Sequence, residues 1–70
     1  MMITQVSYGR TFNTGNFTSE RIDLVAQVDE GEDFRAVKLA LEVEVYRMAG
    51  DVHGMGKART ALARLEAEKA

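Results

Sequence analysis

Two arginines lie close to several aromatic and amide side chains in the first third of the chain, and together they could bind nucleic acid. Arg10 and Arg21 flank an asparagine-rich segment that also holds Phe17. Proteins that bind single strands place basic groups on the phosphate backbone and aromatic rings under the bases. The alternative is an ordinary solvated hairpin, because Glu20 and Asp23 oppose the two arginines. The candidate contacts here are Arg10, Asn13, Asn16, Phe17 and Arg21.

A second group of basic residues lies near the C-terminal end of the chain. Lys57, Arg59 and Arg64 fall within a segment rich in alanine and leucine. They could contact nucleic acid as well, and Lys57 and Arg59 join the candidate nucleic-acid-binding residues. The alternative is a solvated helix whose charges aid solubility. The net charge of −2 does not by itself attract a polyanion.

The sequence contains no recognisable arrangement of catalytic residues. Gly56-Lys57 lacks the earlier glycine and the following Ser or Thr of a phosphate-binding loop, because Asp51 and Ala58 occupy those positions. His53 is the single histidine, and its neighbours in the sequence offer nothing to orient it. The chain has no cysteine, so cysteine-type zinc sites are excluded. We therefore expect no enzyme activity, no catalytic residues, no metal site and no cofactor.

Two strands joined by a turn must position the first group of candidates. Residues 3–12 and 18–28 alternate apolar and polar side chains, which is typical of half-buried strands. Residues 13–16 have turn chemistry. A loop of odd length puts the apolar residues on one face. We therefore predict that Tyr8 pairs with Ile22 and Arg10 with Glu20. Gly9 indicates a bulge or a close approach.

A helix should follow from Asp33 to Ala49, capped by Asp29 or Asp33 and ended by Gly50. Its helical wheel carries apolar residues on two opposite faces. One stripe suits the hairpin, and the second needs another surface to pack against. We assign that second stripe to an interface with a second subunit or with a protein partner, and docking of the C-terminal helix at Val43 is the alternative. The residues of the stripe are Ala36, Leu39, Val43 and Tyr46.

The sequence therefore predicts an α+β fold in the order β-β-α-α. Residues 1–50 would form the hairpin-plus-helix core, residues 51–56 a glycine-rich connector, and residues 57–70 a C-terminal helix. At 70 residues a single core is marginal, and no disulfide can assist it. We expect a homodimer or a higher homo-oligomer, and a long unpaired strand edge could serve as one pairing site.

We expect neither a secretory signal nor a membrane span. The beginning of the sequence lacks the basic region followed by an apolar run that a secretory signal requires. No stretch approaches the roughly 20 apolar residues that a membrane span requires. The chain is therefore expected to be cytoplasmic and to have no membrane partner.

Residues 6–22 carry a distinctive pattern: Ser-Tyr-Gly-Arg-Thr, then Asn, then Gly-Asn-Phe, then Ser, and finally Arg-Ile. This pattern resembles one found in small uncharacterised proteins of phages, archaea and other mobile elements. The resemblance covers about a quarter of the chain and has no counterpart in residues 50–70. It implies a hairpin-then-helix unit and a mobile-element origin, and it supplies no activity.

These observations favour a small non-enzymatic binding protein of phage type, with a regulatory or accessory role. Its partner would be a macromolecule, and single-stranded nucleic acid is the favoured ligand. The alternative is a protein-binding inhibitor or adaptor that uses the apolar helix face. Salt dependence distinguishes the two, because binding through phosphate contacts weakens steeply with salt.

Overall fold

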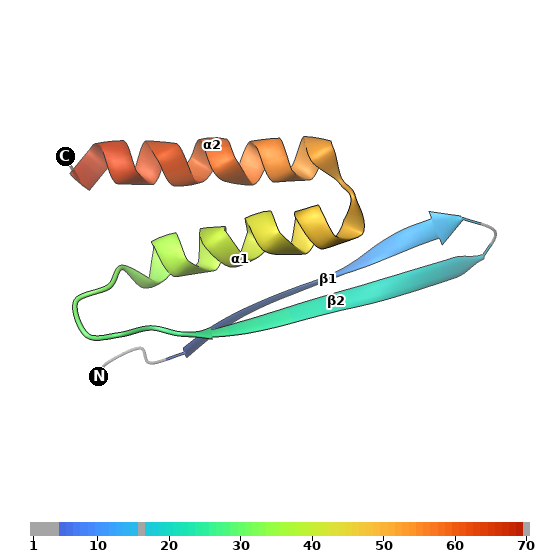
Figure 1. Ribbon diagram of the computed structural model, residues 1–70, viewed down its shortest axis with the longest axis horizontal. Coiled ribbons are helices and arrows are strands. Elements are labelled where there is room, and N and C mark those ends of the chain that lie inside the picture. The colour runs from blue at the N-terminus through green and yellow to red at the C-terminus, as the bar shows by residue number, and fades with distance from the viewer. Residues whose placement is uncertain (1–4, 16, 70) are drawn as a thin grey trace.

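A computed structural model describes residues 5–15 and 17–69 of the chain and shows an antiparallel hairpin followed by two helices (Figure 1). Helix α1 lies across one face of the hairpin, and α2 packs on the far side of α1. This arrangement confirms the predicted α+β fold. The elements are β1 (Gln5–Gly15), β2 (Thr18–Gln27), α1 (Phe34–Ala49) and α2 (Val52–Lys69).

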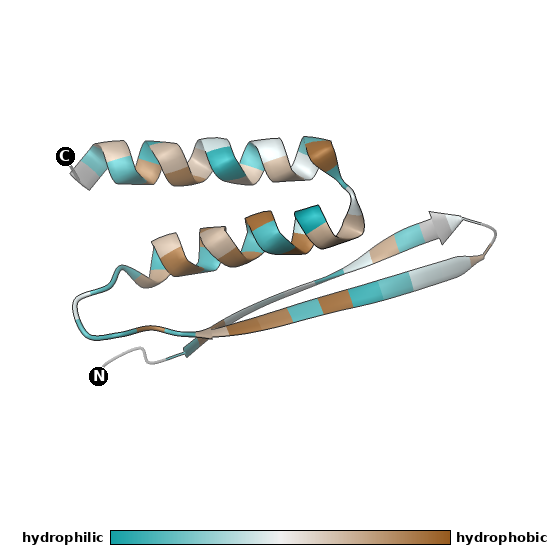
Figure 2. Ribbon diagram, in the orientation of Figure 1, coloured by the Kyte–Doolittle hydropathy of each residue, from teal (hydrophilic) through white to brown (hydrophobic). Residues whose placement is uncertain are grey.

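Alternation along the strands decides which face of the hairpin meets α1. In and just after β2, Ile22 and Val28 are buried and Leu24 is half-buried, whereas Arg21 and Asp23 between them are exposed. Figure 2 shows hydrophobic and hydrophilic residues following one another along this strand. Successive side chains of a strand point to opposite faces. The hairpin therefore has one covered apolar face and one open polar face.

The pairing of the two strands differs from the prediction by two residues. Tyr8 lies opposite Leu24 rather than Ile22, and Arg10 lies opposite Ile22 rather than Glu20. The predicted charge pair between Arg10 and Glu20 is therefore wrong. A shift of two residues leaves every side chain on its predicted face, because the period of a strand is two. The covered and open faces were thus predicted correctly, while the individual partners were not.

The reason for the shift lies in the turn. The register is irregular between Asn13 and Gly15, which gives β1 one extra residue before Gly15 pairs with Thr18. The Asn13 side chain accepts a hydrogen bond from the Gly15 N–H at 2.8 Å, and the Thr18 hydroxyl donates to the Gly15 carbonyl at 2.6 Å. The bulge therefore lies here and not at Gly9. Gly9 instead meets the other expectation, a close approach, because a Cβ atom there would lie 1.8 Å from an Asp23 carboxylate oxygen.

Helix α1 begins and ends with the expected caps. The Asp33 carboxylate accepts a hydrogen bond from the Arg35 N–H at 2.9 Å, which satisfies one free donor of the first turn. Gly50 has a left-handed backbone with φ of 76°. The N–H groups of Gly50 and the next residue bond to the carbonyls of Arg47 and Tyr46, which completes a Schellman motif.

The predicted connector at residues 51–56 is wrong, because α2 already begins at Val52. Gly54 is buried against α1, and a Cβ atom at this position would lie 2.5 Å from the ring of Tyr46. The glycine therefore lets the two helices approach closely. Gly56 has open space around it and no such role.

The second apolar stripe of α1 packs inside the chain rather than facing a second subunit. Val43 and Tyr46 are only 6% and 7% exposed, and they form the core cluster with Ala58 of α2. Ala36 and Leu39 of the same stripe are half-buried. Helix α2 thus supplies the surface that the sequence analysis expected from another subunit, so these four residues do not form a free interface.

The molecule is elongated and thin, so its core is small. The Cα atoms extend over 44 × 25 × 14 Å, and the shortest dimension is close to the diameter of one helix with its side chains. Among the described residues, only Val45 is both large and completely buried. In the same part of the chain, neither helix is long and apolar enough to cross a membrane.

Candidate functional site

A cluster of aromatic rings joins β1 to α1 and holds Arg10 in place. The hydroxyl oxygens of Tyr8 and Tyr46 are 3.1 Å apart, and the Arg10 guanidinium donates to the Tyr46 hydroxyl. The guanidinium carbon lies 5.4 Å from the centre of the Tyr46 ring and 5.9 Å from that of Phe12. Stacked cations of this kind are attracted to the ring face. Arg10 is therefore fixed in position while its side chain stays exposed.

The electrostatics of this cluster follow from its burial and hydrogen bonds. Burial raises the pKa of the Tyr8 hydroxyl above its ordinary value, and the hydrogen bond with Tyr46 raises it further. The hydrogen bond to Tyr46 also raises the pKa of Arg10, so the guanidinium stays charged. Lys38 lies 5.7 Å from the centre of the Tyr8 ring. The cluster therefore presents a permanent positive charge on the covered side of β1.

A cleft of about 320 Å³ opens between β1, α1 and α2, and the exposed Arg10 lies on one of its walls. Lys57 and His53 line it from α2. The residues that line it are Arg10, Leu39, Glu42, Tyr46, Asp51, His53, Gly54, Lys57, Ala58 and Ala61.

Both carboxylates in this cleft are engaged with other groups. Glu42 accepts from Lys38 at 3.2 Å, and the Asp51 carboxylate accepts from the Gly54 N–H at 2.9 Å. The Asp51 interaction places a negative charge at the N-terminal end of α2, where the helix dipole favours it. Within the described residues neither carboxylate forms an ion pair with Arg10 or Lys57, so these two cations can bind an anion.

A shallow groove of about 560 Å³ continues from this cleft along the outer side of α2. It shares His53 and Lys57 with the cleft and adds Thr60 and Arg64. These positions recur every three or four residues, so they lie on one face of the helix. We call the resulting surface the basic strip, formed by Arg10, His53, Lys57 and Arg64.

The cations of the basic strip differ from most other cations of the chain. Arg21, Arg35, Lys38 and Arg47 each form an ion pair with a nearby carboxylate. Within residues 5–15 and 17–69, no ion pair involves Arg10, Lys57, Arg59 or Arg64. Three of these four line the cleft or the groove. Most of the cations without an ion pair in the described residues, all except Arg59, therefore lie along this cleft and groove.

The structure separates the nucleic-acid contacts that the sequence grouped together. Arg10 and Lys57 line the same cleft, whereas Arg21 lies on the open face of the hairpin. Arg21 is bonded there to Asp23 at 3.0 Å and donates to the Thr11 hydroxyl at 3.3 Å. Its charge is therefore already compensated within the chain.

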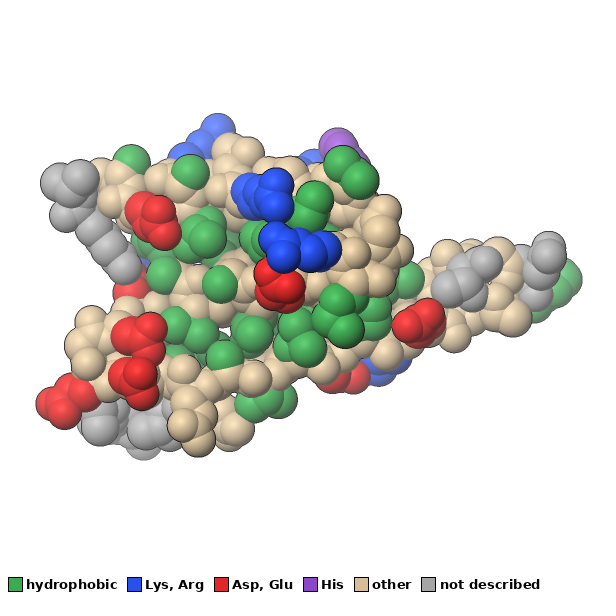
Figure 3. All heavy atoms as spheres, in the orientation of Figure 1, with side chains coloured by type: hydrophobic (Ala, Val, Ile, Leu, Met, Phe, Trp, Pro, Cys, Tyr) green, Lys and Arg blue, Asp and Glu red, His purple; other side chains and the backbone are tan. Residues whose placement is uncertain are grey.

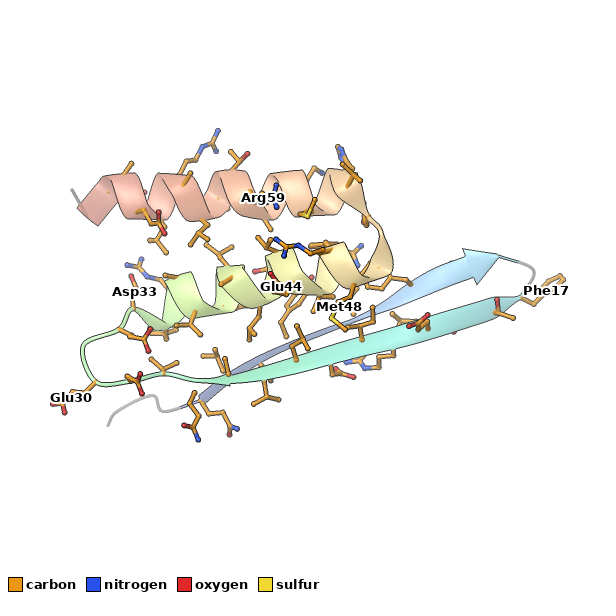
Figure 4. All side chains as sticks on the ribbon, viewed as in Figure 1. Phe17, Glu30, Asp33, Glu44, Met48 and Arg59 are labelled. Carbon is orange, nitrogen blue, oxygen red and sulfur yellow. The ribbon has the colours of Figure 1, made fainter. Side chains whose placement is uncertain are left out.

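The remaining predicted contacts lie elsewhere. Asn13 and Phe17 are at the far tip of the hairpin, beyond the helices, where Figure 4 labels Phe17. Arg59, also labelled there, lies two residues from Lys57 and thus about 160° away around the helix. Asn16 lies outside the described residues.

Two further residues of the site, His53 and Tyr46, were not predicted to lie beside Arg10. His53 was interpreted as a loop residue, although it is in the first turn of α2. Tyr46 was assigned to an interface, although its hydroxyl anchors Arg10. Among the described residues, no three His, Asp or Glu side chains gather in a way that could hold a metal ion.

Comparisons of the chain with protein-family models, with curated proteins and with solved structures found no match.

Proposed function

We propose that the chain is a small non-enzymatic protein that binds the phosphate backbone of nucleic acid through its basic strip. One observation carries the proposal: cations that form no ion pair with another described residue converge on one surface from β1 and α2. A phosphate oxygen accepts readily from a guanidinium, and a lysine adds a point charge. Phosphate contacts also supply most of the affinity of non-specific nucleic-acid binding.

The length of the strip favours a polymer over a single small anion. Lys57 and Arg64 are seven residues apart, which corresponds to about 10.5 Å along the helix axis. Arg10 extends the row beyond the first turn of α2, across the cleft. A single phosphate group cannot contact the whole row, whereas successive phosphates of a strand can.

Stacking on bases requires an exposed ring outside the aromatic cluster, because the rings of that cluster pack against one another. Phe12 and Tyr46 form an edge-to-face pair at 5.9 Å, and Tyr46 is buried. Phe17 is fully exposed, so a base could reach this ring without rearrangement of the core. The proposal therefore assigns affinity to the basic strip and leaves stacking to Phe17.

The protein-binding alternative, an inhibitor or adaptor that acts through the apolar helix face, loses its original surface. Val43 and Tyr46 of that face are covered by α2. A protein partner would therefore need another face of the molecule. A regulatory or accessory role in a phage or other mobile element stays a prediction from the resemblance of residues 6–22.

The experiment is a titration of labelled single-stranded and duplex DNA and RNA, followed by fluorescence anisotropy. Non-specific dissociation constants are typically 10⁻⁴–10⁻⁶ M, so protein concentrations up to about 100 μM suffice. We expect binding at about 50 mM salt that weakens as salt is raised to about 200 mM. Absence of binding to all four nucleic acids would refute the proposal, and binding insensitive to salt would favour an apolar contact instead.

A further inference from the structure

The outer edge of β2 is open, and the strand has no bulge, proline or lysine to disfavour pairing. Among the described residues the sheet has two strands, so each strand has one unpaired edge. Strand β1 carries Gly9 and the bulge near the turn, which disfavour a further partner. Strand β2 is regular over Thr18–Gln27 and contains no glycine, proline or lysine. An edge of this kind is a template for a second strand.

Charges on the open face of β2 are self-complementary about Ile22. Arg21 and Asp23 flank this residue and form an ion pair at 3.0 Å within the chain, and their side chains are 60% and 56% exposed. Pairing with a second copy would exchange this ion pair between the two chains. In an antiparallel pair centred on Ile22, Arg21 faces Asp23 of a second copy, and Asp23 faces its Arg21. Pairing centred on Arg21 or on Asp23 would instead place like charges opposite each other, which is unfavourable.

The same arrangement brings an exposed apolar residue to the symmetry axis. Arg10 pairs with Ile22 and contacts Tyr46, so Ile22 lies beneath the last turns of α1. Met48 is 61% exposed and lies about 160° from Tyr46 around the helix, on the flank above β2. Figure 3 shows hydrophobic side chains gathered between α1 and the hairpin on this face.

The expected distance between the α1 helices of two such copies is also compatible with helix packing. Neighbouring strands are about 4.8 Å apart, so the centres of two hairpins joined through β2 are about 9.6 Å apart. Helices packed against each other have axes 8–10 Å apart. The last turns of the two α1 helices would therefore be in contact, with Met48 of each copy facing the other.

We propose that the chain forms a two-fold symmetric dimer through the edge of β2, in which residues 18–26 pair antiparallel with the same residues of a second copy, centred on Ile22. The sheet then has four strands in the order β1-β2-β2-β1, with both α1 helices on one face. Dimer formation does not depend on the proposed function. The basic strip lies on the side of β1, so it stays exposed in the dimer.

The test uses charge reversal in two chains. Arg21→Asp leaves two acidic residues around Ile22, and Asp23→Arg leaves two basic residues. Each chain alone then places like charges across the axis, and we expect its dimer dissociation constant to rise at least tenfold. A mixture of the two variants restores opposite charges on both sides. Analytical ultracentrifugation should therefore detect a heterodimer of twice the 7.8 kDa chain mass in the mixture.

The matched control is Arg59→Asp, which alters an exposed arginine of α2 and should leave the dimer unchanged. A native chain that is monomeric at about 100 μM would overturn the proposal. So would a dimer that tolerates both single reversals, or a mixture that stays monomeric while each variant is folded by circular dichroism. If a variant fails to fold, isotope-filtered NMR of native chains decides: contacts between Arg21 and Asp23 of different copies support the dimer, and their absence contradicts it.

Discussion

Phe17 has a backbone conformation that phenylalanine rarely adopts. Its φ is 66°, in the left-handed region, and its side chain is fully exposed at the tip of the hairpin. A left-handed backbone costs roughly 1–2 kcal/mol for a residue with a Cβ atom, and asparagine tolerates it better. Sparsely populated conformations cluster at functional sites, and base stacking by Phe17 would account for its presence.

We therefore expect Phe17→Asn to stabilise the chain by about 1 kcal/mol, because strain is relieved and no packing is lost. Urea unfolding of the two chains measures the difference. The same variant should weaken binding to single strands if Phe17 stacks on a base. A chain that is destabilised by this substitution would show that Phe17 contributes packing to the fold.

Gly54 and Gly56, both in the first turns of α2, allow a controlled test of the packing between α1 and α2. A methyl group at position 54 would lie 2.5 Å from the Tyr46 ring, whereas nothing lies within 4 Å of one at position 56. Gly54→Ala should destabilise the chain by about 1–3 kcal/mol through overpacking. Gly56→Ala should stabilise it by up to about 1 kcal/mol, because alanine is the better helix former. Thermal unfolding that shows the same sign for both variants would contradict the close packing of α1 and α2.

At the scale of elements, the contact between β1 and α1 makes stability sensitive to alkaline pH. Burial raises the pKa of Tyr8 in the folded chain above its ordinary value of 10.0. In the unfolded chain Tyr8 therefore loses its proton at a lower pH than in the folded chain. Stability from this group is present below pH 10.0 and declines as the pH rises through the folded pKa.

Replacement of Tyr8 by phenylalanine should remove this part of the pH dependence. Near neutral pH the Tyr8→Phe chain should be less stable by about 0.5–1.5 kcal/mol, because one hydrogen bond is lost. The difference between the two chains should shrink above about pH 10. Urea unfolding across that range measures it. A constant difference at every pH would mean that Tyr8 titrates alike in the folded and unfolded chains.

The sequence predicted those features of the elements that depend on local rules. Alternation identified the covered face of the hairpin, and Asp33 and Gly50 marked the ends of α1. The register could not be predicted, because alternation fixes a face but not a partner, and the bulge near Gly15 shifts the pairing. The start of α2 was missed because glycine usually ends a helix, whereas Gly54 is needed here for close packing.

The candidate site was predicted in part for the same reasons. Arg10 and Lys57 were selected by their charge, but a basic residue carries no sign of its neighbours in space. Their common cleft arises from the packing of α2 on α1, which depends on Gly54 and Tyr46. Alternation does separate Arg10 from Arg21, since the two occupy opposite faces of the hairpin. The two arginines were placed in one candidate site because they are close in the sequence, although they lie on opposite faces.

At the scale of the whole molecule, the basic strip and the open edge of β2 lie on different sides. The basic strip combines β1 and α2, while the open edge of β2 and the exposed Met48 lie on the other side of α1. Under the two proposals, a second copy would occupy one side of the chain and a nucleic-acid strand the other. In the dimer, the two basic strips would lie at opposite ends of the four-stranded sheet.

Lys57 and Arg59 allow the most direct test of the binding surface, because they lie two residues apart on α2 and face different directions. Each phosphate contact contributes a slope of about 0.7 in log affinity against log salt for single strands, which corresponds to roughly eightfold at 50 mM salt. The measurement is the dissociation constant of Lys57→Ala and of Arg59→Ala for one labelled single strand at that salt. We predict that Lys57→Ala weakens binding roughly eightfold and that Arg59→Ala changes it less than about twofold. Equal losses for the two variants, or a larger loss for Arg59→Ala, would contradict the assignment of the basic strip.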